Sequence, residues 1–126
     1  MILKMGEIVN FNYFYNEVKD KKLSLKVLYK LSNLAKAIEE KTVFYREKLQ
    51  EILKEYGEFD ENGNLVPTED GNGIKLRSGT EQDCLTSINE LQMLDVDIPD
   101  IKFDIDDFGN IELTMEVFNL ITPFLN

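Results

Sequence analysis

The chain has 126 residues, a length at which a single domain buries roughly two-thirds of its unfolded surface around one core. It contains no His, which excludes Ser-His-Asp and Cys-His catalysis and imidazole metal ligands. Its net charge of −10 is the wrong sign for binding phosphates, so we expect no direct nucleic-acid contact, with the run KDKKLSLK at 19–26 as the only foothold.

The charge is divided unevenly along the chain. Residues 1–56 contain eleven Lys/Arg and eight Asp/Glu, net +3, whereas residues 57–126 contain three and sixteen, net −13. No window approaches the roughly 18 consecutive apolar residues of a membrane helix, and no secretory signal opens the chain, so we expect neither a membrane span nor export.

A helix is predicted over residues 6–19. Apolar and aromatic residues recur there every three or four positions, at Ile8, Phe11, Tyr15 and Val18. Tyr13 and Phe14 lie off that line. Because aromatic residues favour strands, the run VNFNYFY leaves a strand as the alternative for this segment.

The most regular element is a long helix over residues 24–56. Ser24 is the predicted N-cap, and no Gly or Pro interrupts the run before Gly57, where we expect a left-handed C-terminal cap. Spacings of three and four alternate without a slip through Leu28, Leu31, Ala35, Ile38, Thr42, Tyr45, Leu49, Ile52 and Tyr56.

Such a helix is longer than the domain it belongs to. About 32 residues extend about 48 Å, whereas a compact domain of this size has a diameter of roughly 36 Å. The helix therefore breaks near KTVFY at 41–45, or is covered by several shorter elements, or is covered in part by another chain. The repeat also permits a coiled coil, so intramolecular packing and self-association both stay open.

Residues 58–77 are predicted to form a small hairpin or an exposed loop. The segment contains two Asn-Gly pairs, Asn62-Gly63 and Asn72-Gly73. Asn-Gly is the strongest short-range hairpin signal because both residues tolerate positive φ.

The remaining chain predicts shorter elements. Ser78 and Glu81 form an S-x-x-E capping box before a helix over about residues 80–94. Alternation in VDIPDIKFDIDDFGNIEL predicts a half-buried strand pair with Pro99 at an edge. Thr114 then caps a short helix whose apolar residues, Val117, Phe118 and Ile121, dock on the core.

These elements predict an α+β fold in one domain, residues 1–126. A long central α-helix is packed by an N-terminal helix and two shorter C-terminal helices, with a small antiparallel β element. The helical part is 1–57, the hairpin or loop 58–77 and the acidic α/β part 78–126.

Catalytic constellations are sparse. Cys84 lies beside Asp83 on the apolar side of a predicted helix, which favours a buried thiol over a nucleophile. Asp104, Asp106 and Asp107 offer paired carboxylates or a Mg²⁺ site, but a solvated edge that resists aggregation explains them more simply. We therefore expect no enzyme activity, no cofactor and no metal.

The chain resembles a known family over about residues 6–126. The features that carry the resemblance are the order of the elements, the block LSLKVLYKLSNLAKAI, the helix exit KEYGEFDENGN and the strand-like DVDI. They are similar to those of a family of small, uncharacterised tailed-phage proteins without an assigned activity. One departure is the segment GNGIKLRSGTEQD, which is altered at its centre and does not fix the hairpin register.

The resemblance implies a phage protein in the bacterial host cytoplasm or in the virion, acting by protein–protein contact. The expected role is a virion-associated or assembly protein of the tail or neck, whose partner is a phage structural protein or a second copy. The alternative is an acidic inhibitor that binds a basic host defence nuclease as a nucleic-acid mimic. The residues expected at the partner surface are Tyr13, Phe14, Phe44, Tyr45, Asp104, Asp106 and Asp107.

Overall fold

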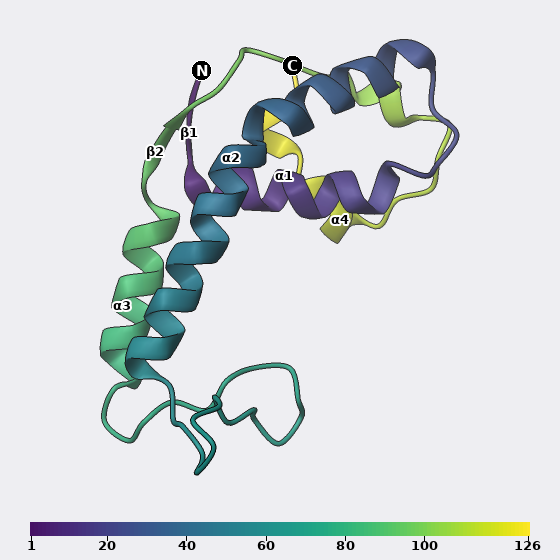
Figure 1. Ribbon diagram of the computed structural model, residues 1–126. Helices are drawn as coiled ribbons and strands as arrows, with labels where there is room; N and C mark the ends of the chain where they lie inside the picture. Colours follow the sequence, from purple (N-terminus) through teal and green to yellow (C-terminus); the bar gives the residue numbers. More distant parts are fainter.

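The computed structural model describes residues 1–126 and confirms the α+β fold with a long central helix (Figure 1). Its helices are α1 (Met5–Val18), α2 (Leu25–Tyr56), α3 (Glu81–Gln92) and α4 (Met115–Asn119). Its strands are β1 (Ile2–Lys4) and β2 (Asp95–Asp97), and 3-10 turns cover Ile105–Phe108 and Thr122–Phe124. None of the helices combines the length and apolar character needed to cross a bilayer.

The long helix α2 belongs to two different parts of the molecule. We call residues 1–38 and 95–126 the body, and residues 39–94 the arm. Figure 1 shows α2 crossing the body beside α1 and then continuing downward next to α3. The ribbon changes direction as it leaves the body but stays helical across residues 41–45. The helix therefore overhangs its domain without breaking.

The main core lies entirely in the body. Its fifteen buried residues include four from the first half of α2, namely Val27, Leu31, Leu34 and Ile38. Aromatic rings fill its centre, with ring centroids 5.0 Å apart for Phe11 and Phe124 and 5.3 Å apart for Phe14 and Phe108. Burying such rings supplies most of the stabilisation that a core of this size has.

Both predicted helix starts in the body are confirmed. Ser24 Oγ accepts a hydrogen bond from the Val27 N–H at 3.3 Å, and Thr114 Oγ1 accepts one from the Val117 N–H at 3.2 Å. The helical prediction for residues 6–19 is also confirmed, because α1 is continuous from Met5 to Val18 and the strand alternative fails. Ile121 is buried as expected, while Val117 and Phe118 pack half-buried against the core.

The small sheet differs from its prediction. β1 pairs antiparallel with β2, with Leu3 opposite Val96, so the partner of DVD comes from the start of the chain. The second half of the predicted strand pair is instead the 3-10 turn Ile105–Phe108. Alternation of apolar and acidic residues was misleading here, because Phe103 and Phe108 are buried while Ile105 is exposed.

The arm is a two-helix hairpin. α3 lies along the second half of α2 (Figure 1), and only two of its residues, Cys84 and Leu91, are buried. No residue of α2 beyond Ile38 is buried, although the apolar spacing continues to Tyr56. Two helices alone cannot enclose a core, so the arm's apolar side chains remain half-exposed.

Residues 57–80 form a compact tip at the end of the arm. Three passes of the chain meet there, since the Glu58 N–H donates to Lys75 O at 2.9 Å, the Val66 N–H to Glu58 O at 2.9 Å, and the Lys75 N–H to Val66 O at 2.8 Å. Two turns project from this crossing, closed by the pairs Phe59–Leu65 and Pro67–Ile74. The predicted hairpin is thus two short turns.

The turns do not use the geometry that Asn-Gly predicted. No non-glycine residue has positive φ, so neither Asn62 nor Asn72 adopts it. Gly63 (φ 78) and Gly71 (φ 74) take the left-handed positions instead. The side chains of Asp60 and Asp70 accept hydrogen bonds from backbone N–H groups inside each turn. Each segment therefore reverses direction through an Asx turn.

Two predicted caps of the arm are wrong. Gly57 is extended (φ −74, ψ 155), and its glycine identity is required because a Cβ would collide with the Leu53 carbonyl oxygen and the Leu65 side chain. At α3 the N-cap is Thr80, and no capping hydrogen bond joins Ser78 to Glu81. The hydroxyl of Thr80 instead donates to Arg77 O at 2.6 Å.

Candidate partner-binding groove

The predicted surface aromatics are divided by the structure. Tyr13 is 60% exposed on α1, whereas Phe14 is fully buried. Phe14 therefore leaves the candidate surface, because its ring packs edge-on against Phe108 inside the core. On the arm, Phe44 is 41% exposed and Tyr45 is half-buried against the body.

Asp104, Asp106 and Asp107, which we call the acidic trio, lie at the start of the 3-10 turn Ile105–Phe108, where Asp104 and Asp107 form a capping box. The Asp104 N–H donates to Asp107 Oδ2 at 2.9 Å, and Asp104 Oδ1 accepts from Asn126 Nδ2 at 2.7 Å. Asp106 alone makes no such hydrogen bond. The alternation with Ile105 placed Asp104 and Asp106 on one face of a strand, which is wrong, because residues 105–108 form a 3-10 turn.

An apolar groove follows one side of the arm. Phe44 from α2 and Leu94, which follows α3, lie at its middle and are 41% and 44% exposed. Both residues line two neighbouring hollows, one toward the body and one toward the tip. The hollow toward the body is floored by Met5 and Val96, and the one toward the tip by Ile52 and Leu91. We call this continuous surface the arm groove.

One wall of the groove is formed by neighbouring turns of α2. Phe44 and Lys48 are four residues apart and therefore share one side of the helix. Lys48 Nζ lies 5.7 Å from the centre of the Phe44 ring and 3.2 Å from Glu51 Oε2. The ammonium group thus covers part of the ring and leaves the rest to solvent.

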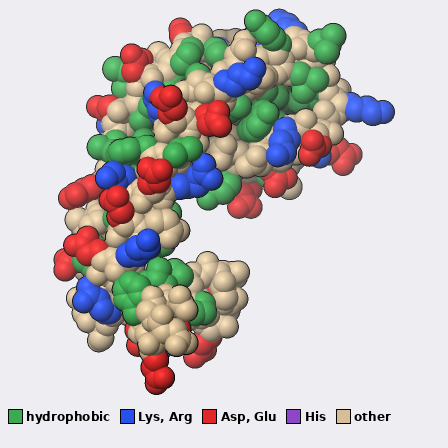
Figure 2. Space-filling model, viewed as in Figure 1, with side chains coloured by type: hydrophobic (Ala, Val, Ile, Leu, Met, Phe, Trp, Pro, Cys, Tyr) green, Lys and Arg blue, Asp and Glu red, His purple; other side chains and the backbone are tan.

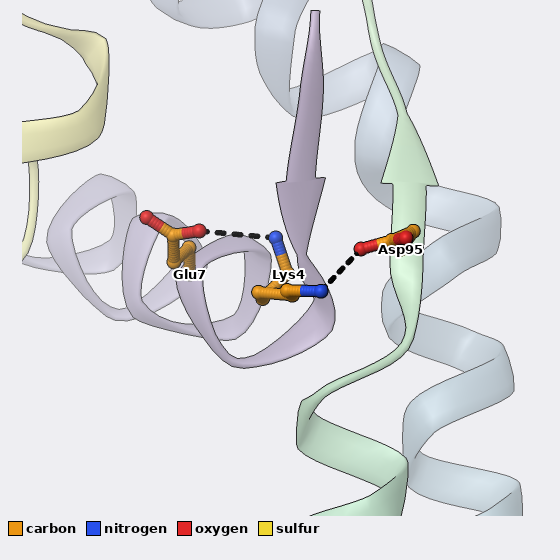
Figure 3. Close-up of polar contacts among 3 residues, drawn as sticks. All are labelled: Lys4, Glu7 and Asp95. Carbon is orange, nitrogen blue, oxygen red and sulfur yellow. Dashed lines mark hydrogen bonds and ion pairs between the residues drawn. The ribbon is translucent and has the colours of Figure 1, made fainter.

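A polar anchor holds the body end of the groove (Figure 3). Lys4 Nζ donates to Asp95 Oδ1 at 2.5 Å, and the Lys4 N–H donates to Glu7 Oε1 at 3.0 Å. These contacts connect β1 to β2 and to the first turn of α1. Because Asp95 lines the groove, Lys4 fixes the position of that wall.

The groove's rim is acidic. The lining carboxylates are Glu40, Glu51, Glu55, Glu90, Asp95 and Asp97, and the lining lysines are Lys41 and Lys48. Because Lys4 pairs with Asp95 and the N-terminal ammonium group pairs with Asp97, the net charge is −2. Figure 2 shows the narrow arm below the wider body, with charged side chains of both signs along it. An apolar floor with an acidic rim suits a partner that is apolar and basic.

Cys84 takes no part in the groove. It is 2% exposed between the arm helices, and its burial raises the pKa of the thiol above the ordinary value of 9.0. The thiol therefore stays protonated at neutral pH, as expected for a buried structural cysteine.

A second apolar surface was missed by the sequence pattern. Leu25 (85% exposed) and Tyr29 (70% exposed) lie one turn apart on the outer side of α2. Four exposed lysines without ion pairs surround them in sequence: Lys19, Lys21, Lys22 and Lys26. We call Lys19–Tyr29 the basic corner. The sequence pattern that could have revealed this surface is the pair Leu25 and Tyr29, which are four residues apart and lie on a different side of α2 from its buried residues.

Comparisons with known proteins add no relative. No protein-family model matches the chain, and no curated protein or solved structure matches it either.

Proposed function

We propose that this protein is a non-enzymatic phage protein that works through protein–protein contacts, as a virion-associated or assembly component of the tail or neck. The phage setting is supported by the family resemblance of the sequence. The arm groove is the observation that supports a contact role. It offers an apolar floor around Phe44 and Leu94, on an element that projects from the body.

The groove supports this role because its apolar surface is organised. Single exposed apolar side chains are common on proteins, whereas a contiguous apolar strip with a polar rim is typical of an interaction site. Here the strip joins residues from α2, from the end of α3 and from β2. An aromatic residue, Phe44, stands at its centre, as in many interface hot spots.

The inhibitor alternative receives less support from the geometry. A nucleic-acid mimic presents free carboxylates in place of phosphates. Two members of the acidic trio, Asp104 and Asp107, each have one carboxylate oxygen in a local hydrogen bond. We therefore do not propose this activity for the trio.

The test is the presence of the protein in particles. Purified particles of the encoding phage are analysed by mass spectrometry, with the wild-type gene and with a Phe44→Ser, Leu94→Ser groove variant. We expect the wild-type chain at constant copy number and a several-fold loss of the variant. The matched control is Met115→Ser, which removes an apolar side chain that is 72% exposed on the body.

Circular dichroism of each purified variant separates lost docking from lost folding. The proposal is rejected if the wild-type protein is absent from particles and copurifies with no phage structural protein. It is also rejected if the groove variant enters particles as well as the control does.

A further inference from the structure

Two surfaces of the chain are complementary in both polarity and charge. The arm groove has an apolar floor and a net charge of −2 once the cations paired with Asp95 and Asp97 are counted. The basic corner has two strongly exposed apolar side chains, Leu25 and Tyr29, and four lysines against one acid, Asp20. Each surface alone is incomplete, because its apolar part lies in water.

One molecule cannot join its own two surfaces. Leu25 and Phe44 lie on the same continuous helix, nineteen residues apart, which is about 28 Å along the axis. The helix is unbroken between them, so the basic corner stays far from the groove of its own chain. Only a second molecule brings a corner to that groove.

We propose that a second copy of this chain occupies the arm groove with its basic corner, so that copies associate head to tail. Leu25 and Tyr29 then pack on Phe44 and Leu94, while the corner lysines face the carboxylates of the rim. This inference rests on the proposed contact function and names the partner of the same groove.

Charge decides between this arrangement and the symmetric one. Two grooves facing each other bring −2 against −2, and like charges facing each other at an interface are unfavourable. A corner facing a groove brings unlike charges together instead. Because the two contacting surfaces differ, the association is heterologous, and repetition of it produces a ring or a filament.

The test uses two charge-reversal variants that leave the core untouched. The corner variant is Lys22→Glu, Lys26→Glu, and the groove variant is Glu55→Lys, Glu90→Lys; all four side chains are exposed. Sedimentation velocity at low salt measures association of each variant over a concentration series. We expect wild-type oligomers that grow beyond dimers and dissociate at high salt.

Each variant alone is expected to be monomeric, with association weakened about tenfold or more. An equimolar mixture is expected to regain association, because the intact groove of one variant meets the intact corner of the other, and the reversed corner meets the reversed groove. Combining all four substitutions in one chain reverses both surfaces and restores self-association. That combined variant also shows that the substitutions do not act through misfolding.

Three outcomes overturn the proposal. These are a monomeric wild-type chain, a mixture that forms no dimer, and loss of association in the groove variant but not in the corner variant, which indicates a groove-to-groove dimer. A monomeric chain that is still present in particles rejects only the head-to-tail contact. A head-to-tail oligomer absent from particles rejects only the proposed virion role.

Discussion

The two halves of α2 have the same apolar spacing and different surroundings. In the body, Leu31, Leu34 and Ile38 are at most 1% exposed, because α1 and the C-terminal segments cover them. In the arm, where α2 packs against α3, Leu49, Ile52 and Tyr56 continue the series and none is buried. A periodic stripe thus tells which side of a helix is apolar, and the rest of the chain decides whether that side is covered.

This difference explains why one helix carries both scaffold and surface. The body half is fixed by a three-dimensional core, whereas the arm half keeps apolar side chains available to a partner. Elements with few buried contacts also open more easily than the core. The predictions below compare the two halves, beginning with the largest expected effect.

The same leucine truncation is expected to cost more in the body than in the arm. Leu34→Ala removes a fully buried side chain and should lower the free energy of unfolding by about 2 to 5 kcal/mol. Leu49→Ala removes a half-buried one and should cost about 1 to 2 kcal/mol. Urea unfolding followed by circular dichroism measures both. Equal losses would show that the arm is as well packed as the body.

The junction of α2 with the tip should tolerate no Cβ. Gly57→Ala forces a side chain against the Leu53 carbonyl and Leu65, at a cost of about 1 to 3 kcal/mol, as overpacking does. Gly73→Ala is the control, because its Cβ would meet only Thr68 at 3.6 Å, an ordinary contact. NMR spectra should show shifts at the tip for Gly57→Ala alone. A folded, unshifted Gly57→Ala tip would contradict this packing.

Capping should matter at the body end of α2 and not at the predicted box of α3. Ser24→Ala removes the acceptor of the Val27 N–H and should cost about 1 kcal/mol. Ser78→Ala removes a hydroxyl that makes no capping hydrogen bond and should be close to neutral. Thermal unfolding compares the two. A larger loss for Ser78→Ala would support the capping box that the sequence suggested.

The smallest expected effect is a pH response at the tip. Hydrogen bonds from the Thr68 hydroxyl and the Asn72 N–H hold the pKa of Asp70 below its ordinary value of 3.8. A lowered folded-state pKa means that the stabilisation of the turn is present above pH 3.8 and is lost as the pH falls through the folded value.

NMR titration of the Gly71 and Asn72 amides should therefore show a transition below pH 3.8. Asp70→Asn should remove this transition, and Glu69→Gln, at a neighbouring carboxylate without a hydrogen bond, should keep it. A transition that survives in Asp70→Asn would assign it to another group.

Local sequence signals predicted the helices well. Ser24, Thr114 and the apolar spacing act within a few residues, so α1, α2 and α4 followed from the sequence. The length of α2 left open whether the helix breaks near residues 41–45, and the structure shows that it does not. The pairing of β2 with β1 joins segments more than ninety residues apart, and no local pattern reports such a partner.

The candidate site was only partly predictable. Phe44 was expected at the surface and lies there, because it stands off the apolar line of α2. Phe14 was off the same kind of line and is nevertheless buried, because the C-terminal segment covers the second side of α1 with Phe108. Leu94 became part of the groove only because α3 ends at Gln92 and the chain turns there into β2.

Native-state hydrogen exchange along α2 tests the central claim most directly, because it measures each half of one helix separately. At a concentration where the chain is monomeric, amides from Leu31 to Ile38 should exchange only by global unfolding. Amides from Lys48 to Leu53 should exchange at least about tenfold faster, through opening of the arm. Uniform protection from Leu31 to Leu53 would contradict the division of this helix into a buried half and a half that is exposed for contact with a partner.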